Sequence, residues 1–223
     1  MNEMFRQSLF AGVTISLIAY EIGLFLKRKL GLAILNPLLV SIVIVILALK
    51  VFGISYEVYN ASAKYISYLL TPATVCLAVP LYEQLELLKK NKVAVVCGIL
   101  SGTLASLTGI FVLCMLFGFN HQQYVTMLPK SITTAELGGI VTITVAVIII
   151  TGILGNVIAD TVFHIFKIKN PLAKGLALGT ASHAIGTARA IEMGPVEGAM
   201  SSLAVAVAGL LTVVFVSGFA QLI

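Results

Sequence analysis

Charged residues are scarce in this sequence. Only 10% of the 223 residues are Asp, Glu, Lys or Arg, whereas a soluble domain carries about 25%. Tryptophan is absent, and only three cysteines and three histidines occur. Hydrophobic residues make up 59% of the chain, and its mean hydropathy is +1.08. This composition excludes a soluble domain and indicates an integral membrane protein.

The few cysteines and acidic residues also argue against several kinds of site. Cys76, Cys97 and Cys114 lie inside apolar runs without the spacing of metal ligands, so we interpret them as small core residues. No acid–base pair stands at a spacing that would support hydrolysis. We therefore expect no metal, no cofactor and no enzymatic activity. The net charge of +5 fits lysines in cytoplasmic loops and does not indicate a nucleic-acid partner.

Long apolar runs divide the chain into membrane segments. A helix needs about 20 apolar residues to cross the hydrocarbon core, and the first run ends at basic residues instead of a cleavage site, so we expect it to be retained. The predicted spans are 8–26, 33–53, 63–88, 93–118, 139–166, 172–193 and 197–222. The sequence thus predicts an all-α polytopic membrane protein, 1–223, with seven segments in a single membrane domain. Residues 124–138 are expected to be re-entrant or to lie at the surface.

Three basic clusters predict the orientation of these spans. Residues 27–29, 89–92 and 167–169 are dense in Lys and Arg, and such clusters stay on the cytoplasmic side. The N-terminus is then outside. The last three spans run in the opposite sense to the second, third and fourth, which predicts inverted repeats over 33–118 and 124–222.

A weak internal similarity accompanies this symmetry. Thr71-Pro72-Ala73-Thr74 and Gly179-Thr180-Ala181-Ser182 each open a segment of small residues after a Leu-rich stretch. Both segments could simply pack tightly against neighbouring helices. Alternatively, both are helices interrupted near the middle of the bilayer, as in many transporters, where the positive end of a half-helix faces an anion.

The stretch 171–194 is the leading candidate site. It is too polar for an ordinary span, and as a helix it would place Gly179, Ser182, His183, Gly186 and Arg189 on one side. Histidine and arginine are costly at membrane depth unless they meet a partner, a cavity or a substrate. We expect Arg189 to bind a carboxylate. His183 either carries a coupled proton or has a packing role.

A second polar cluster, 128–139, contains Lys130 and several hydroxyl residues. Lys130 could hold a carboxylate together with Arg189, or it could be a snorkelling lysine in an interfacial loop. Asp160 and His164 stand four residues apart, the spacing of a helical pair, which we interpret as a structural ion pair, with a proton relay as the alternative. The predicted substrate-binding residues are Thr71, Thr74, Lys130, Ser131, Thr133, Thr134, Gly179, Thr180, Ser182, His183, Gly186, Thr187 and Arg189.

Three motifs carry a resemblance to a known family. LTPATVCLAVPLYEQ, LPKSITT and especially LALGTASHAIGTARAIEMGPVEGAMSSLA resemble the LrgB/CidB family of bacterial membrane proteins, which includes a plastid glycolate/glycerate translocator. The resemblance extends over nearly the whole chain. One departure is a short connection: only Ala135, Glu136 and Leu137 separate Thr134 from Gly138-Gly139, where relatives have several more residues. The path of 124–138 therefore stays open.

The resemblance implies two functions and a location in the bacterial plasma membrane. One is control of murein hydrolase activity and autolysis together with a small holin-like partner of the LrgA/CidA type. The other is transport of small 2-hydroxy or 2-oxo monocarboxylates, such as glycolate, glycerate or pyruvate. We predict carboxylate transport linked to autolysis, with a non-transporting regulator as the alternative, and we expect a homo-oligomer in contact with membrane lipid.

Overall fold

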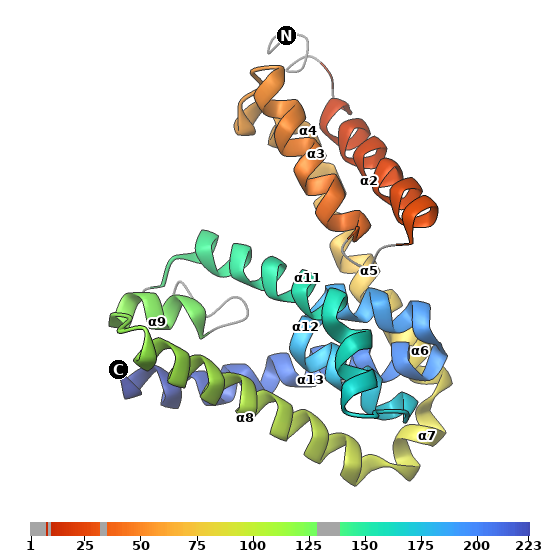
Figure 1. Ribbon diagram of the computed structural model, residues 1–223, viewed down its shortest axis with the longest axis vertical. Helices are drawn as coiled ribbons and strands as arrows, with labels where there is room; N and C mark the ends of the chain where they lie inside the picture. Colours follow the sequence, from red (N-terminus) through yellow and green to blue (C-terminus); the bar gives the residue numbers. More distant parts are fainter. Residues whose placement is uncertain (1–7, 9, 32–34, 129–138) are drawn as a thin grey trace. The chain divides into compact units, whose positions relative to one another are not determined.

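The computed structural model describes residues 8, 10–31, 35–128 and 139–223 and divides the chain into two compact units, 1–76 and 77–223 (Figure 1). The described residues form helices and no strand, which confirms the all-α class. The boundary between the units falls inside the predicted first repeat, 33–118. The repeats themselves stay a prediction.

Unit 1 packs α2 (Ala11–Leu30) against α3 (Pro37–Val51) and α4 (Tyr56–Ser67), followed by the short α5 (Leu70–Cys76). The glycines of α2 allow the close approach: a Cβ at Gly12 would lie 2.7 Å from the Tyr59 carbonyl oxygen. Ser62 of α4 accepts a hydrogen bond of 2.8 Å from the Gly12 amide. Because α2 has no side-chain cap of its own, Ser62 satisfies one of the free amides of its first turn.

Unit 2 contains the remaining helices. These are α6 (Ala78–Glu83), α7 (Leu85–Lys90), α8 (Lys92–Leu116), α9 (His121–Met127), α11 (Val141–Ile165), α12 (Pro171–Met193), α13 (Pro195–Phe219) and the 3-10 turn η1 (Ala220–Leu222). Helices α8 and α13 run parallel. Val95 packs with Ala199 and Met200 at one end, and Cys114 clusters with Val216 at the other.

Four helical stretches of the described residues are long and apolar enough to cross a membrane. They are Tyr56–Glu83, Lys92–Leu116, Val141–Ile165 and Pro195–Leu222, in agreement with four of the predicted spans. The predicted span 33–53 corresponds to α3, which has 15 residues and reaches about 22 Å, less than the hydrocarbon thickness of about 30 Å. The predicted span 8–26 corresponds to α2.

The predicted direction of the last span is wrong. Helix α13 should run opposite to α8 if residues 172–193 cross the membrane, but the two helices are parallel. The C-terminus confirms this, because the backbone oxygen of Ile223 lies 2.6 Å from His121 Nδ1, just beyond the far end of α8. The segment before α13 therefore does not cross the membrane.

Candidate functional site

Helix α12 is broken at His183. This residue has φ 48° and ψ −135°, far from helical values, and separates a first arm, 171–182, from a second arm, 184–193. A Cβ on Gly186 would overlap the carbonyl oxygen of Leu178. In a continuous helix these residues would be separated by about 12 Å along the axis. The second arm therefore folds back along the first, and α12 is a helical hairpin.

Helix α13 holds both arms. Along the first arm, a Cβ at Gly175 would lie 2.9 Å from Met200 Cβ, and a Cβ at Gly179 would lie 2.7 Å from Ala204 Cβ. Because residue numbers rise together along both segments, the first arm runs parallel to α13. The second arm runs antiparallel to α13. Its Thr187 hydroxyl lies 2.9 Å from that of Ser201, and its Ile191 packs on Gly198. Small residues thus let three helical segments approach at backbone distance.

The tip of the hairpin lies at the middle of the neighbouring helices. Gly155, near the centre of α11, faces the Ser182 hydroxyl, and a Cβ on Gly102, near the centre of α8, would lie 3.1 Å from Thr180 Oγ1. Both helices have 25 residues, enough to cross the hydrocarbon core. His183 therefore lies level with the centres of these two helices, which is the middle of the bilayer for helices that span it.

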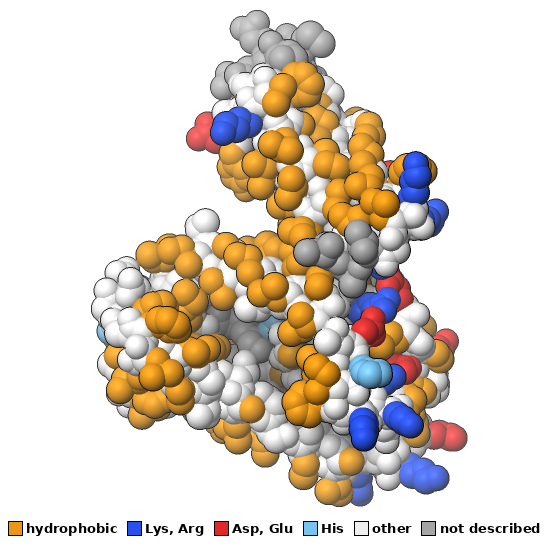
Figure 2. Space-filling view, viewed as in Figure 1, with side chains coloured by type: hydrophobic (Ala, Val, Ile, Leu, Met, Phe, Trp, Pro, Cys, Tyr) orange, Lys and Arg blue, Asp and Glu red, His pale blue; other side chains and the backbone are white. Residues whose placement is uncertain are grey.

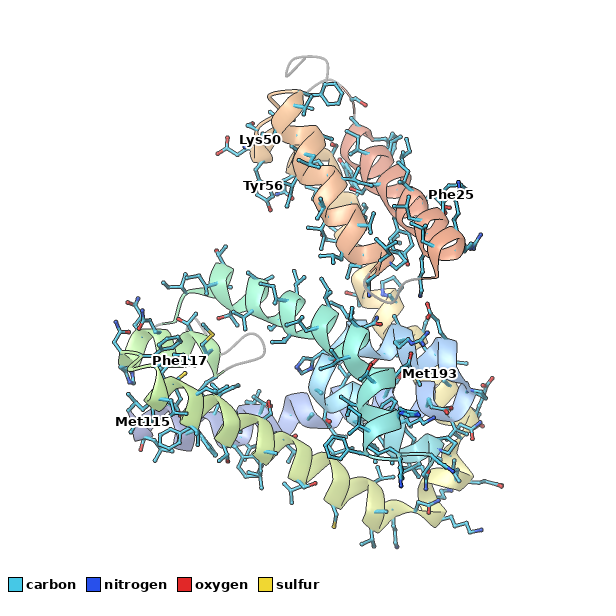
Figure 3. All side chains as sticks on the ribbon, in the orientation of Figure 1. Phe25, Lys50, Tyr56, Met115, Phe117 and Met193 are labelled. Atoms are coloured by element: carbon cyan, nitrogen blue, oxygen red, sulfur yellow. The ribbon has the colours of Figure 1, made fainter. Side chains whose placement is uncertain are left out.

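Lysines mark the end at which the hairpin enters. Residues 89–92 lie at the start of α8, and 167–169 directly follow α11. Figure 2 shows Lys and Arg side chains gathered at this end of unit 2. In Figure 3, Met193 at the end of the second arm and Phe117 beyond the end of α8 lie at opposite ends of unit 2. By the excess of cytoplasmic Lys and Arg, the hairpin enters from the cytoplasmic side, and α13 ends outside.

A cavity of about 360 Å³ lies on the outer side of the tip, and the hollow is visible in Figure 2. We call it the outer cavity. It is lined by Ser106, Ile110, Leu113, Cys114, Phe117, Phe119, Thr126, Met127, Thr144, Val147, Ile148, Thr151, Ala181 and His183. Its walls come from the outer halves of α8 and α11 and from α9, and its floor is the hairpin tip.

The threonine hydroxyls of the outer cavity already donate their protons to backbone carbonyls. Thr126 donates to Gln122 O at 2.6 Å, and Thr144 donates to Thr126 O at 2.7 Å. Thr151 donates to Val147 O at 2.8 Å. A hydroxyl has one proton and two lone pairs, so these groups offer a ligand acceptors. Donors for an anion would come from Ser106, His183 and the first amides of the second arm.

Arg189 lies apart from this cavity. Its guanidinium donates to Asp160 of α11 at 2.7 Å and to Glu192 at 3.0 Å. The side chains of Arg189, Asp160 and Glu192 are 27%, 56% and 49% exposed. The prediction that Asp160 pairs with His164 is wrong, because Asp160 pairs with the hairpin instead. Arg189 thus attaches the second arm to α11.

The hairpin separates the other predicted site residues. Among those that the structure describes, His183 alone lines the outer cavity. Ser182 lines a small cavity of about 130 Å³ between α11 and the first arm, and its buried hydroxyl has no hydrogen-bond partner among the described residues. Gly179 and Gly186 permit close packing, while Thr187 donates to His183 O at 2.9 Å.

The remaining predicted residues belong to unit 1 or fall outside the described residues. Thr71 belongs to α5 of unit 1, as does Thr74, whose side chain is outside the described part. Lys130, Ser131, Thr133 and Thr134 fall within 129–138, outside the described residues. Sequence reasoning missed the cavity residues Ser106, Thr126, Thr144 and Thr151. A hydroxyl residue inside an apolar helix is a weak signal that does not by itself indicate a cavity.

We expect His183→Gly to be more stable than His183→Ala by about 1–2 kcal/mol, because φ 48° with ψ −135° is a conformation that glycine adopts without strain. Thermal denaturation in detergent would measure the difference, and both variants lack the imidazole. In an unbroken helix the order would be reversed, since alanine is favoured over glycine by about 1 kcal/mol. A more stable alanine variant would therefore contradict the break.

These features define a polytopic membrane protein with a re-entrant helical hairpin and a cavity at its tip. The LrgB-like family matches residues 16–222, and the chain belongs to this family. It is 40% identical over 218 residues to the antiholin-like protein LrgB of Bacillus cereus (strain B4264), covering 94% of this chain and 95% of that protein. The antiholin-like protein LrgB of Bacillus anthracis (strain CDC 684 / NRRL 3495) gives the same values. No solved structure matches the chain.

Proposed function

We propose that this chain is an antiholin-like membrane protein that takes part in the control of autolysis. The support is the likeness to the relatives from Bacillus, which extends over 94% of the chain. A small holin-like membrane protein is the partner we expect for this role, and self-association is a further prediction.

We further propose that the molecular activity behind this role is the passage of small monocarboxylates across the membrane. The observation that carries this proposal is the hairpin break at His183, at the floor of the outer cavity. Discontinuous helices at the bilayer midplane recur in transporters, because their free backbone groups meet a solute there. A protein that only filled the membrane would need no such break.

The tip offers an anion several donors. The first amides of the second arm have no helical partner and lie at the positive end of its dipole. His183 and Ser106 line the same cavity, and the remaining walls are largely apolar. Such a cavity suits a short organic acid, whose carboxylate faces the tip and whose carbon chain faces the walls. Lys130, Thr133 and Thr134 stay candidate contacts by their residue types.

A non-transporting regulator is the alternative. It is favoured by the names of the relatives and by the lining of the outer cavity, which contains no Lys or Arg among the described residues. In that reading the chain acts by contact with its holin-like partner.

The test combines two measurements. Proteoliposomes containing the chain alone are expected to take up labelled glycolate or pyruvate with saturation, and expression of the chain in a strain that lacks its LrgB protein is expected to restore normal autolysis. If the proteoliposomes take up neither acid but the chain restores normal autolysis, the chain is a regulator that does not transport. Failure of complementation by folded protein would remove the role in autolysis.

A further inference from the structure

A second hollow of unit 2 lies on the cytoplasmic side of the hairpin tip. It has a volume of about 860 Å³ and lies in the groove that α8 and the first arm of α12 form where they pack together. Its lining starts at Ala94 and Asn170, near the basic end, and finishes at Ser106 and Ala181, near the tip. We call it the inner hollow.

The inner hollow and the outer cavity meet at two residues. Ser106 of α8 and Ala181 of the first arm line both of them. On α8, the inner hollow is lined from Ala94 to Ser106 and the outer cavity from Ser106 onward past Cys114. Ala94 and Cys114 are about 30 Å apart along the helix, which equals the hydrocarbon thickness of a typical bilayer.

The junction is narrow because the helices are close there. A Cβ on Gly102, one turn before Ser106, would lie 3.1 Å from Thr180 Oγ1, next to Ala181. Ser106 brings a hydroxyl to this point, and His183 lies on its outer side. The side chains of Ser106 and Ala181 are small and obstruct the junction little. The Ser106 hydroxyl still offers a solute one polar contact.

We infer that the two hollows are the two halves of one path across the membrane and that Ser106 and Ala181 form the constriction between them. This rests on the proposed transport activity. The path runs between α8 and the first arm of the hairpin. The solute class is the one proposed above, a monocarboxylate of two or three carbons.

Cysteine labelling tests the path without any substrate. The background is the full chain with Cys76, Cys97 and Cys114 replaced by alanine, reconstituted in one orientation and exposed to a membrane-impermeant methanethiosulfonate. Ser106→Cys is expected to react from either side. Thr151→Cys, in the outer cavity alone, should react at least tenfold faster from outside, and Ser101→Cys, in the inner hollow alone, at least tenfold faster from the cytoplasmic side.

Val96→Cys is the matched control, because this α8 residue is 61% exposed and lines neither hollow. It is expected to resist the reagent from both sides. If Ser106→Cys reacts from one side or from neither, the hollows do not connect. If Ser101→Cys is as inert as Val96→Cys, lipid fills the inner hollow. Either result overturns the inference.

Blocking the junction gives a second, independent readout. Ala181→Leu is expected to lower uptake of glycolate at least tenfold, whereas Ala146→Leu, at an exposed position of α11 that lines neither hollow, should leave it within twofold. Equal uptake by the two variants would overturn the constriction. If Ser106→Cys is labelled from both sides but the protein transports no monocarboxylate, the proposed transport activity is wrong and the path is still supported.

Discussion

Gly179→Val is expected to abolish the recovery of folded protein from the membrane. A Cβ at this position would lie 2.7 Å from Ala204 Cβ and 2.9 Å from Ser201 Cα, and it would overlap the Ser201 carbonyl oxygen. Backbone atoms of a neighbouring helix cannot move aside as a flexible side chain can. Overpacking typically costs about 1–3 kcal/mol, and valine adds two further methyl groups. Size-exclusion chromatography of detergent-solubilised protein would measure the loss.

Gly209→Val is the matched control for this prediction. Gly209 lies on α13, and a Cβ there would meet nothing within 4 Å. The control should therefore give a normal monodisperse peak although the substitution is the same. If Gly179→Val also elutes normally with an unchanged melting temperature, the first arm does not pack on α13 at backbone distance.

Arg189→Ala is expected to destabilise the protein by about 1 kcal/mol. The substitution leaves Asp160 and Glu192 without the cation that binds both of them, and ion pairs exposed to this degree contribute up to about 1 kcal/mol. The melting temperature in detergent or nanodiscs would report the change. Arg189→Ala combined with Asp160→Asn should recover more than half of the loss, because one of the two charges has been removed.

This double variant also separates two roles of Arg189. If the arginine only attaches the second arm to α11, the stabilised double variant should regain uptake together with its melting temperature. If Arg189 binds the carboxylate of the solute, stability returns and uptake does not. A melting temperature unchanged by Arg189→Ala would contradict the ion pairs.

The helical class and most spans could be predicted from composition and run length alone. The limits of α8 and α11 agree with the predicted spans 93–118 and 139–166 within a few residues, because a long apolar run permits little else in a bilayer. The interruption of the segment 171–194 was also indicated, since its small and polar residues do not suit a lipid-facing helix.

The return of the chain at His183 could not be predicted. A positive φ is uncommon for any residue other than glycine, and the reversal depends on α13, which offers backbone surface to both arms. The reversal changes the direction of α13 and the place of the site residues. On a straight helix, His183 and Arg189 would share one face. In the hairpin, His183 lies at the tip beside the outer cavity, whereas Arg189 forms an ion pair with Asp160.

The first proline-containing segment behaves differently. The segment that contains Pro72 and Pro80 is divided into the short helices α5 and α6, but Leu77, between them, keeps helical dihedrals of φ −65° and ψ −17°. The prolines lie near the starts of α5 and α6, where a missing amide is tolerated. Proline position, more than proline number, decides whether a helix breaks.

The hairpin has a consequence for how the protein is made. Its glycines pack on residues 197–204, which are synthesised after both arms. At about 5–20 residues per second, this surface follows the second arm by roughly 0.5–2 s. The two arms can therefore reach their final positions only once α13 has been made, so these three segments fold as one cooperative unit.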